Sequence, residues 1–270
     1  MFATIINDCK DDNAVGRQMS RLASLGATGL SFVGVDSDLE ASMQLIDVLD
    51  ATEGRSGLIL VNVAPRGGSA AQFENGTPFA YFRYGETLIL ASIDGYTLSA
   101  VKELGLIEAV ALLDTHTSAP ALVAAGIVSE EAAARIPTTQ FRSFDFTPRA
   151  GVHLFKGGAL PHERYDLTDV PDLPKAIWHI DNFGNCKTTL RRGDITVDTP
   201  TKTRFGEFPF FTQLKSVPDH TAALTEGSSG LGPTRFLELV IERGHFAKVH
   251  DAKIGDDIFT ETSHFRTATT

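Results

Sequence analysis

The chain has 270 residues, 42% hydrophobic and 21% charged, a composition typical of a globular protein long enough to form two hydrophobic cores. Its formal net charge of -10 argues against binding to nucleic acid or to an anionic membrane, which requires clustered Lys and Arg. No apolar run approaches the ~18 residues of a membrane span, and the two cysteines and the non-basic N-terminus lead us to expect a cytoplasmic protein without a disulfide framework.

The first half of the chain alternates segments typical of buried strands with segments typical of amphipathic helices. Strands are expected at residues 2–6, 30–35, 58–63, 81–84, 87–93 and 110–113. Helices are expected from a cap at Asp12 or Asn13 to Ser24, from a cap at Asp38 to a stop at Gly54, and over residues 96–104 and 119–136. This order, with its short connections, predicts an α/β domain with a central, mostly parallel sheet covered by helices.

The character of the sequence changes after about Gly157. The glycines and prolines of residues 157–174 are typical of a linker, which divides the chain into an α/β domain at residues 1–160 and a smaller domain at residues 172–270. Short strands are expected in the smaller domain at residues 176–180, 186–190, 208–214 and 236–241. Because helical periodicity is nearly absent there, the smaller domain is predicted to be mainly β.

Carboxylates follow three of the predicted strands. Asp8 comes after strand 2–6, Asp36 after strand 30–35 and Asp94 after strand 87–93. Residues just past the carboxyl ends of parallel strands line the ligand crevice of an open sheet, and a carboxylate there suits the hydroxyls of a ribose. The alternative is that each Asp caps the next helix or begins a turn. For Asp8, which lies in an unusually polar run, we favour ligand binding.

The loop after strand 58–63 contains Arg66, Gly67 and Gly68. Its glycines would let backbone amides approach a ligand. The glycine spacing does not match the phosphate-binding patterns, so a plain loop is an equally good interpretation.

Two polar segments of the second domain are candidate sites for an amino-acid group. Between strands 176–180 and 186–190, Asp181, Phe183 and Asn185 offer an acid for an ammonium, an aromatic face for a stem and an amide for a carboxylate. The alternative is an ordinary hairpin turn. Before strand 236–241, Ser228 and Ser229 can hold a carboxylate with their hydroxyl and N–H groups, and a flexible loop is the equal alternative.

Signatures of metal binding and of a catalytic nucleophile are absent from the sequence. The eight histidines show neither an i, i+4 pair nor a paired-Cys spacing, and there is no G-x-S-x-G elbow or Cys/His signature. We therefore expect no metal, no cofactor and no hydrolase triad. The carboxylates past the strand ends, which suit ribose hydroxyls, indicate a small nucleoside-like molecule as the ligand.

Taken in order, these segments resemble the S-adenosylmethionine hydroxide adenosyltransferase family, which includes the fluorinase and chlorinase enzymes. The family opens with a strand ending in Thr/Ser-Asp, an acidic loop and Val-Gly in the first helix, matched here by Asn7-Asp8-Cys9, Asp12 and Val15-Gly16. Its second-domain signature is an Asp before Phe-Gly-Asn and a following Thr, matched by Asp181, Phe183-Gly184-Asn185 and Thr188. Its C-terminal signature is echoed by residues 228–230, 237–240, 244–247 and 254–257.

The resemblance implies an enzyme that binds S-adenosylmethionine and cleaves its C5′–S bond with water, releasing adenosine and methionine. It also implies an α/β domain plus a barrel-like β domain, and a homotrimer whose ligand lies between one subunit's first domain and a neighbour's second. The implied ligand contacts are Asp8 to the ribose, Asp181 and Asn185 to the methionine end, Ser228 to its carboxylate, and the backbone around Phe246 and Ala247 to the adenine.

The sequence departs from the family where the chemistry takes place. Ala64 stands where hydroxide-transferring members carry an Asp, and Phe141 stands where they carry a His. Gly67 replaces the Thr of the halide-binding loop, so a halide role is not supported. Two alternatives therefore stay open: a catalytically silent protein that binds S-adenosylmethionine or adenosine as a sensor or scaffold, and a transfer to a different nucleophile in a pocket rebuilt around Arg66 and Arg142.

Overall fold

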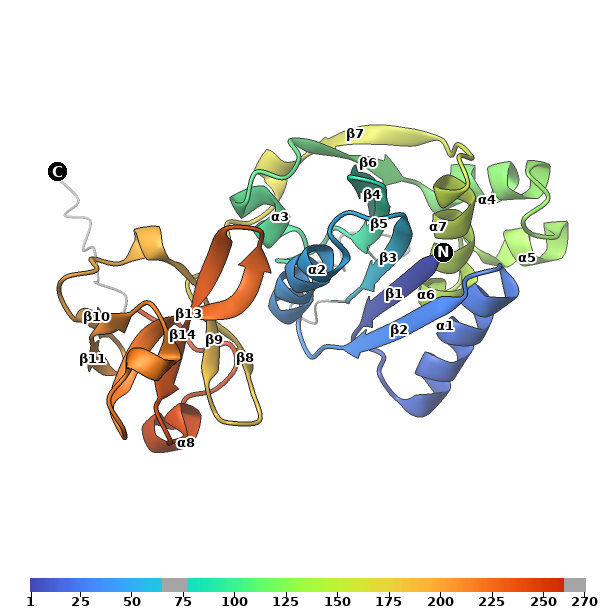
Figure 1. Ribbon diagram of the computed structural model, residues 1–270. Coiled ribbons are helices and arrows are strands. Elements are labelled where there is room, and N and C mark those ends of the chain that lie inside the picture. Colours follow the sequence, from blue (N-terminus) through green and yellow to red (C-terminus); the bar gives the residue numbers. More distant parts are fainter. Residues whose placement is uncertain (65–76, 260–270) are drawn as a thin grey trace, which may run out of the picture. The chain divides into compact units, whose positions relative to one another are not determined.

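The computed structural model of the protein describes residues 1–64 and 77–259 (Figure 1). Contacts within the chain define two compact units, Met1–Leu173 and Pro174–Thr270. Each unit is described by itself below.

A seven-stranded sheet in the order β2-β1-β3-β5-β4-β6-β7 forms the centre of the first unit. Strand β1 is parallel to β2 and β3, and β3 is parallel to β5, whereas β4, β6 and β7 join through antiparallel pairs. The prediction of an α/β unit with a mostly parallel sheet is confirmed. The strands are β1 (Phe2–Asn7), β2 (Gly29–Gly34), β3 (Gly57–Asn62), β4 (Phe79–Tyr84), β5 (Thr87–Ser92), β6 (Ala109–Leu113) and β7 (His162–Asp166).

Strand β7 lies within residues 157–174, which the sequence predicts to be a linker. It pairs with β6 at the edge of the sheet, and four of its five residues are exposed. An edge strand with polar residues on both faces carries no alternating apolar pattern, so the sequence gives no strand signal there. The prediction of a linker is wrong for these residues, and the first unit extends past residue 160 to Leu173.

Helices cover both faces of this sheet. Helix α1 packs against α7, which contacts β3 and β5, while α2 contacts β1, β3 and α3 (Figure 1). Leu22 of α1 shares a core with Ala3, Ile5 and Leu60, which point to one face because side chains alternate along a strand. The helices are α1 (Asp12–Ser24), α2 (Asp38–Thr52), α3 (Ser99–Glu103), α4 (Thr115–Ala124), α5 (Glu130–Arg135), α6 (Arg142–Asp145) and α7 (Thr147–Phe155).

Several helix boundaries differ from the predictions; α3, for example, begins at Ser99 rather than at residue 96. Asp11 caps α1, accepting hydrogen bonds from the N–H groups of residues 13 and 14, and Ser37 rather than Asp38 caps α2. The helix predicted over residues 119–136 is divided into α4 and α5. Gly126 lies between them with a φ of 69°. The helix ends there because a residue in the left-handed conformation terminates an α-helix.

The second unit is mainly β, as predicted. Its larger sheet has the strand order β12-β13-β14-β9-β8, and β10 and β11 form a separate pair. No pairing recorded within residues 174–259 joins the edge strands β12 and β8, so closure into a barrel is not seen. The elements are β8 (Ile177–Ile180), β9 (Cys186–Arg191), β10 (Thr201–Thr203), β11 (Gly206–Phe208), β12 (Phe210–Phe211), β13 (Ala222–Leu231), β14 (Thr234–Ile241) and α8 (Phe246–His250).

Within residues 1–64 and 77–259, no helix combines the length and the apolar character that a membrane crossing requires.

Candidate functional site

The carboxyl ends of β1 and β3 form the switch point of the first sheet. These two strands are neighbours, but the chain leaves β1 toward β2 on one side and β3 toward β5 on the other. Ligands of open α/β sheets bind in the crevice at such a point, because the loops after the two strands separate there. Asp8 directly follows β1, and Val63 and Ala64 follow β3.

Asp8 presents an unused acceptor at this switch point. Its Oδ2 accepts a hydrogen bond from the Ala64 N–H at 3.1 Å, which joins the ends of the two strands. Its Oδ1 is buried and has no hydrogen-bond partner among the residues that the structure describes. An unpaired buried carboxylate oxygen is costly and therefore points to a missing donor.

A buried amide network below Asp8 fixes the position of the turn. The Asn7 side chain is fully buried, and its Nδ2 donates to Gln18 Oε1 at 2.7 Å. Asn7 Oδ1 accepts from the Cys9 N–H at 2.8 Å and from Asn62 Nδ2 at 3.4 Å. The network ties α1, β1 and β3 together, so the backbone that carries Asp8 has little freedom.

The other two predicted carboxylates at strand ends already have partners. Asp94 is buried and accepts from Thr77 Oγ1 at 3.3 Å and from the Gly95 N–H at 2.9 Å, as in a turn. Asp36 is exposed and pairs with Lys10 Nζ at 2.6 Å. The alternative interpretation, a turn or surface role, accounts for both, and Asp8 is the strand-end carboxylate with an oxygen left over in the described part of the unit.

Arg142 lies at the same edge of the sheet. Its guanidinium carbon is 5.1 Å from the centre of the Phe79 ring, and Phe79 is in register with Ser92 at the end of β5. Burial lowers the pKa of Arg142 to about 10. Phe141 is 61% exposed and stacks on Phe144, and it offers no group that can move a proton. Arg66 and Gly67 lie outside the described residues.

In the second unit, Asp181 and Asn185 form a turn that satisfies its own polar groups. Asp181 Oδ1 accepts from the N–H groups of Phe183 and Asn185, both at 2.9 Å, and Oδ2 accepts from Asn185 Nδ2 at 3.0 Å. The Phe183 side chain is 67% exposed. The arrangement fits the hairpin alternative, and it leaves the Phe183 ring as the group of this turn that is open to a ligand.

Phe246 and Ala247 pack in the core of the second unit. The Phe246 ring is fully buried, contacts Phe205 and Phe208 edge-on, and stacks on His250 at 4.3 Å. The Ala247 N–H donates to Gly184 O at 3.0 Å. These contacts assign the two residues a packing role, which the sequence motif does not reveal.

Ser228 and Ser229 lie inside β13, where the pairing register with β14 shifts between Glu226 and Gly230. The interpretation of residues 227–230 as a loop before a strand is therefore wrong. A Gly-Ser-Ser-Gly run has low strand propensity, but a bulge accommodates it because one strand gains unpaired residues.

Lys187 reaches these serines from β9, which is separated from β13 by β14. Its Nζ donates to Ser228 Oγ at 3.0 Å and to Ser229 Oγ at 2.8 Å, and Glu238 Oε1 is 3.8 Å away. The Trp178 ring centre is 5.8 Å from the same ammonium, and Trp178 Nε1 is buried without a hydrogen-bond partner in the described chain. Sequence reasoning missed Lys187 and Trp178, because only strand pairing brings positions 178, 187 and 228 together.

The two cysteines differ in accessibility. Cys186 is buried, and burial, aided by the charges of Asp181 and Asp256, raises its pKa to about 12, whereas Cys9 is exposed. Because only the thiolate reacts, we expect thiol titration near pH 8 to detect about one cysteine in the native protein and about two in denaturant. A Cys9→Ser variant should show none in the native state. Two fast-reacting thiols in the native protein would contradict this placement.

The described elements define a mixed α/β protein with a large, mostly parallel sheet and a second, mainly-β unit. A similar fold occurs in an uncharacterized conserved protein from Thermotoga maritima, with a TM-score of 0.66 and 15% identity over 95% of this chain and 98% of that one. It also occurs in a conserved hypothetical protein from Thermus thermophilus, with a TM-score of 0.51 and 15% identity over 94% and 96% of the two chains. At this identity the likeness shows the fold alone. No protein-family model and no curated protein matches the chain.

Proposed function

We propose that the protein binds S-adenosylmethionine and cleaves its C5′–S bond with water, releasing adenosine and methionine. The observation that carries the proposal is the buried Asp8 Oδ1 at the switch point of the sheet, which has no hydrogen-bond partner within residues 1–64 and 77–259. Such a carboxylate oxygen can accept a hydrogen bond from a ribose hydroxyl, which is a neutral donor, so no positively charged partner is needed. The sequence resemblance assigns the ribose to the same residue.

The second unit supports the proposal through Lys187. The Lys187 ammonium and the two serine hydroxyls beside it are donors suited to the carboxylate of methionine, and Glu238 is an acceptor for its ammonium. These contacts add Lys187 and Glu238 to the ligand residues that the sequence motifs suggest. The barrel-like second domain, the homotrimer and the cytoplasmic location belong to the same proposal.

The proposed reaction needs no proton acceptor in the bond-breaking step. The water oxygen forms a bond to C5′ as the C5′–S bond breaks, the sulfur of the neutral methionine keeps the electron pair, and the proton passes to solvent. The sulfonium group already departs readily as a neutral sulfide. The protein would therefore accelerate the reaction by positioning and desolvating the water.

A catalytically silent binding protein is the second candidate. The observation that favours it lies at positions 64 and 141. The Ala64 side chain is a methyl group, its backbone N–H already donates to Asp8, and the Phe141 ring is apolar and exposed. Neither side chain can orient or deprotonate a water.

Calorimetric titration with S-adenosylmethionine and with adenosine tests the binding. We expect Asp8→Asn to weaken both affinities by about 10- to 100-fold, because an amide cannot accept on both sides as a carboxylate does. Asn still accepts from the Ala64 N–H, so the fold is preserved. The matched control is Asp36→Asn, an exposed carboxylate at the end of β2, which should leave both affinities unchanged.

Equal affinities of the wild type and Asp8→Asn would remove the ribose assignment. Chromatography of the same mixtures then separates the two candidates. Adenosine and methionine formed above the rate without protein support the enzyme, and binding without products supports the silent protein.

A further inference from the structure

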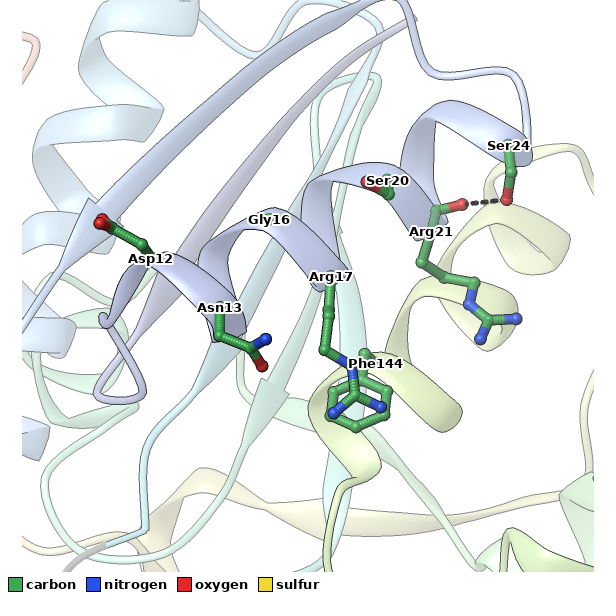
Figure 2. A pocket seen from close by; sticks show the side chains of 8 residues that line it. All are labelled: Asp12, Asn13, Gly16, Arg17, Ser20, Arg21, Ser24 and Phe144. Carbon is green, nitrogen blue, oxygen red and sulfur yellow. Dashed lines mark hydrogen bonds between the residues drawn. The ribbon is translucent and has the colours of Figure 1, made fainter.

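A groove of about 540 Å³ runs along the outer face of α1 in the first unit (Figure 2). Asn13, Arg17 and Arg21 form one row at four-residue intervals, and Gly16, Ser20 and Ser24 form the row beside it. A Cβ atom added at Gly16 would meet no atom within 4 Å, so the small-residue row is open at this position. The groove therefore combines a basic wall with a floor of small, polar residues.

Positive charge is concentrated in this part of an otherwise acidic chain. Burial lowers the pKa of Arg149, and the nearby charges of Arg21 and Arg135 lower it further, while Asp145, 3.7 Å from Arg149, raises it. Within the described residues, no carboxylate forms an ion pair with Arg17 or Arg21. A local excess of guanidinium groups in a protein with a net charge of -10 indicates a place for an anion.

Arg17 is held in a fixed orientation. Its guanidinium carbon lies 3.7 Å from the centre of the Phe144 ring, and that ring stacks on Phe141. A guanidinium that stacks through its face keeps its in-plane N–H groups available for hydrogen bonds. Figure 2 shows Arg17 and Arg21 pointing to the same side of α1, while the carboxylate of Asp12 lies at the other end of the groove and points away from them.

We propose that this groove, called the α1 groove, binds a small molecule that carries two or more phosphate groups, with Arg17 and Arg21 holding the phosphates. Arginine matches phosphate because its planar fork donates two parallel hydrogen bonds. One helical turn separates the two guanidinium stems, which suits a diphosphate better than a single small anion. Asn13 and Ser20 supply neutral donors beside them. The site shares no residue with the Asp8 network and goes beyond the proposed function.

Calorimetric titration of the full chain with pyrophosphate tests the proposal. We expect saturable binding with one pyrophosphate per chain, and an affinity reduced by about tenfold or more in Arg17→Gln and in Arg21→Gln. Arg55→Gln and Arg243→Gln are matched controls, because both arginines are exposed and each stands beside one carboxylate. They should leave the affinity unchanged, as should Asp8→Asn. Circular dichroism checks that each variant is folded.

Three results would overturn the proposal. The first is absence of pyrophosphate binding to the wild type. The second is unchanged affinity in the Arg17→Gln/Arg21→Gln double variant. The third is an equal loss in the control variants, which would mean that pyrophosphate responds to overall charge rather than to the α1 groove. The pyrophosphate titration contains no S-adenosylmethionine. A failure of the α1-groove proposal and a failure of the proposed function would therefore appear in separate titrations.

Discussion

Replacing Phe246 by alanine is expected to lower the free energy of unfolding of the second unit by about 3–5 kcal/mol. The ring is fully buried and contacts Phe205, Phe208 and His250, so its removal leaves a cavity among rigid aromatic neighbours. Trp178 is the single tryptophan of the chain and is buried in the same unit. Urea denaturation followed by its fluorescence therefore reports on this unit.

Phe183→Ala is the matched control for this variant. Both phenylalanines are ligand-binding residues in the sequence prediction, but the Phe183 ring is 67% exposed. Its removal should change the free energy of unfolding by about 0.5 kcal/mol or less. Similar losses in the two variants would contradict the contrast between a core residue and a surface residue.

Gly184→Ala is expected to destabilise the second unit by about 2–3 kcal/mol. Gly184 has a φ of 84°, and a Cβ there would lie 2.0 Å from the His245 ring. The ring would have to leave its position at the start of α8, where His245 Nδ1 accepts from the Lys248 N–H at 3.1 Å. The cost of the backbone strain and the cost of losing this helix cap therefore both lower the free energy of unfolding. The same fluorescence-monitored denaturation measures the change.

Gly193→Ala serves as the control for a glycine in the same unit. Gly193 lies in the short 3-10 helix Arg192–Asp194, and a Cβ there meets no atom within 4 Å. Its substitution should change the stability by about 0.5 kcal/mol or less. A Gly184→Ala variant as stable as Gly193→Ala would mean that His245 does not hold the position described.

The buried strands of the first unit are predictable because their sequences are almost wholly apolar. Nearly every residue of β1, β3 and β5 is buried, so Thr4 is the single polar residue inside these strands and the others stand at strand ends. Helix α7 escapes prediction because Pro148 and Gly151 suggest a turn. In the structure, Pro148 lies in the first turn of the helix, and Gly151 lets it approach β3, where an added Cβ would be 2.9 Å from Leu60.

The candidate site is predictable only where position along a strand is enough. Asp8 is found because the end of a parallel strand is a known location for ligand contacts. Its partner Ala64, and Lys187 beside Ser228, come from other strands of the same sheets, whose order and register the sequence does not specify. The motif residues Phe246 and Asp181 also have structural roles, in core packing and in a turn, which a sequence motif does not distinguish from ligand binding.

The buried pair of Asn7 and Gln18 constrains how this sequence can evolve. The loss of either amide would leave the other with an unmet hydrogen bond in the interior. A viable intermediate between two lineages must therefore replace both amides nearly at once, or pass through a chain stabilised elsewhere. The second turn of α1 and the end of β1 thus change together or not at all, and a lineage that keeps one of these amides is expected to keep the other.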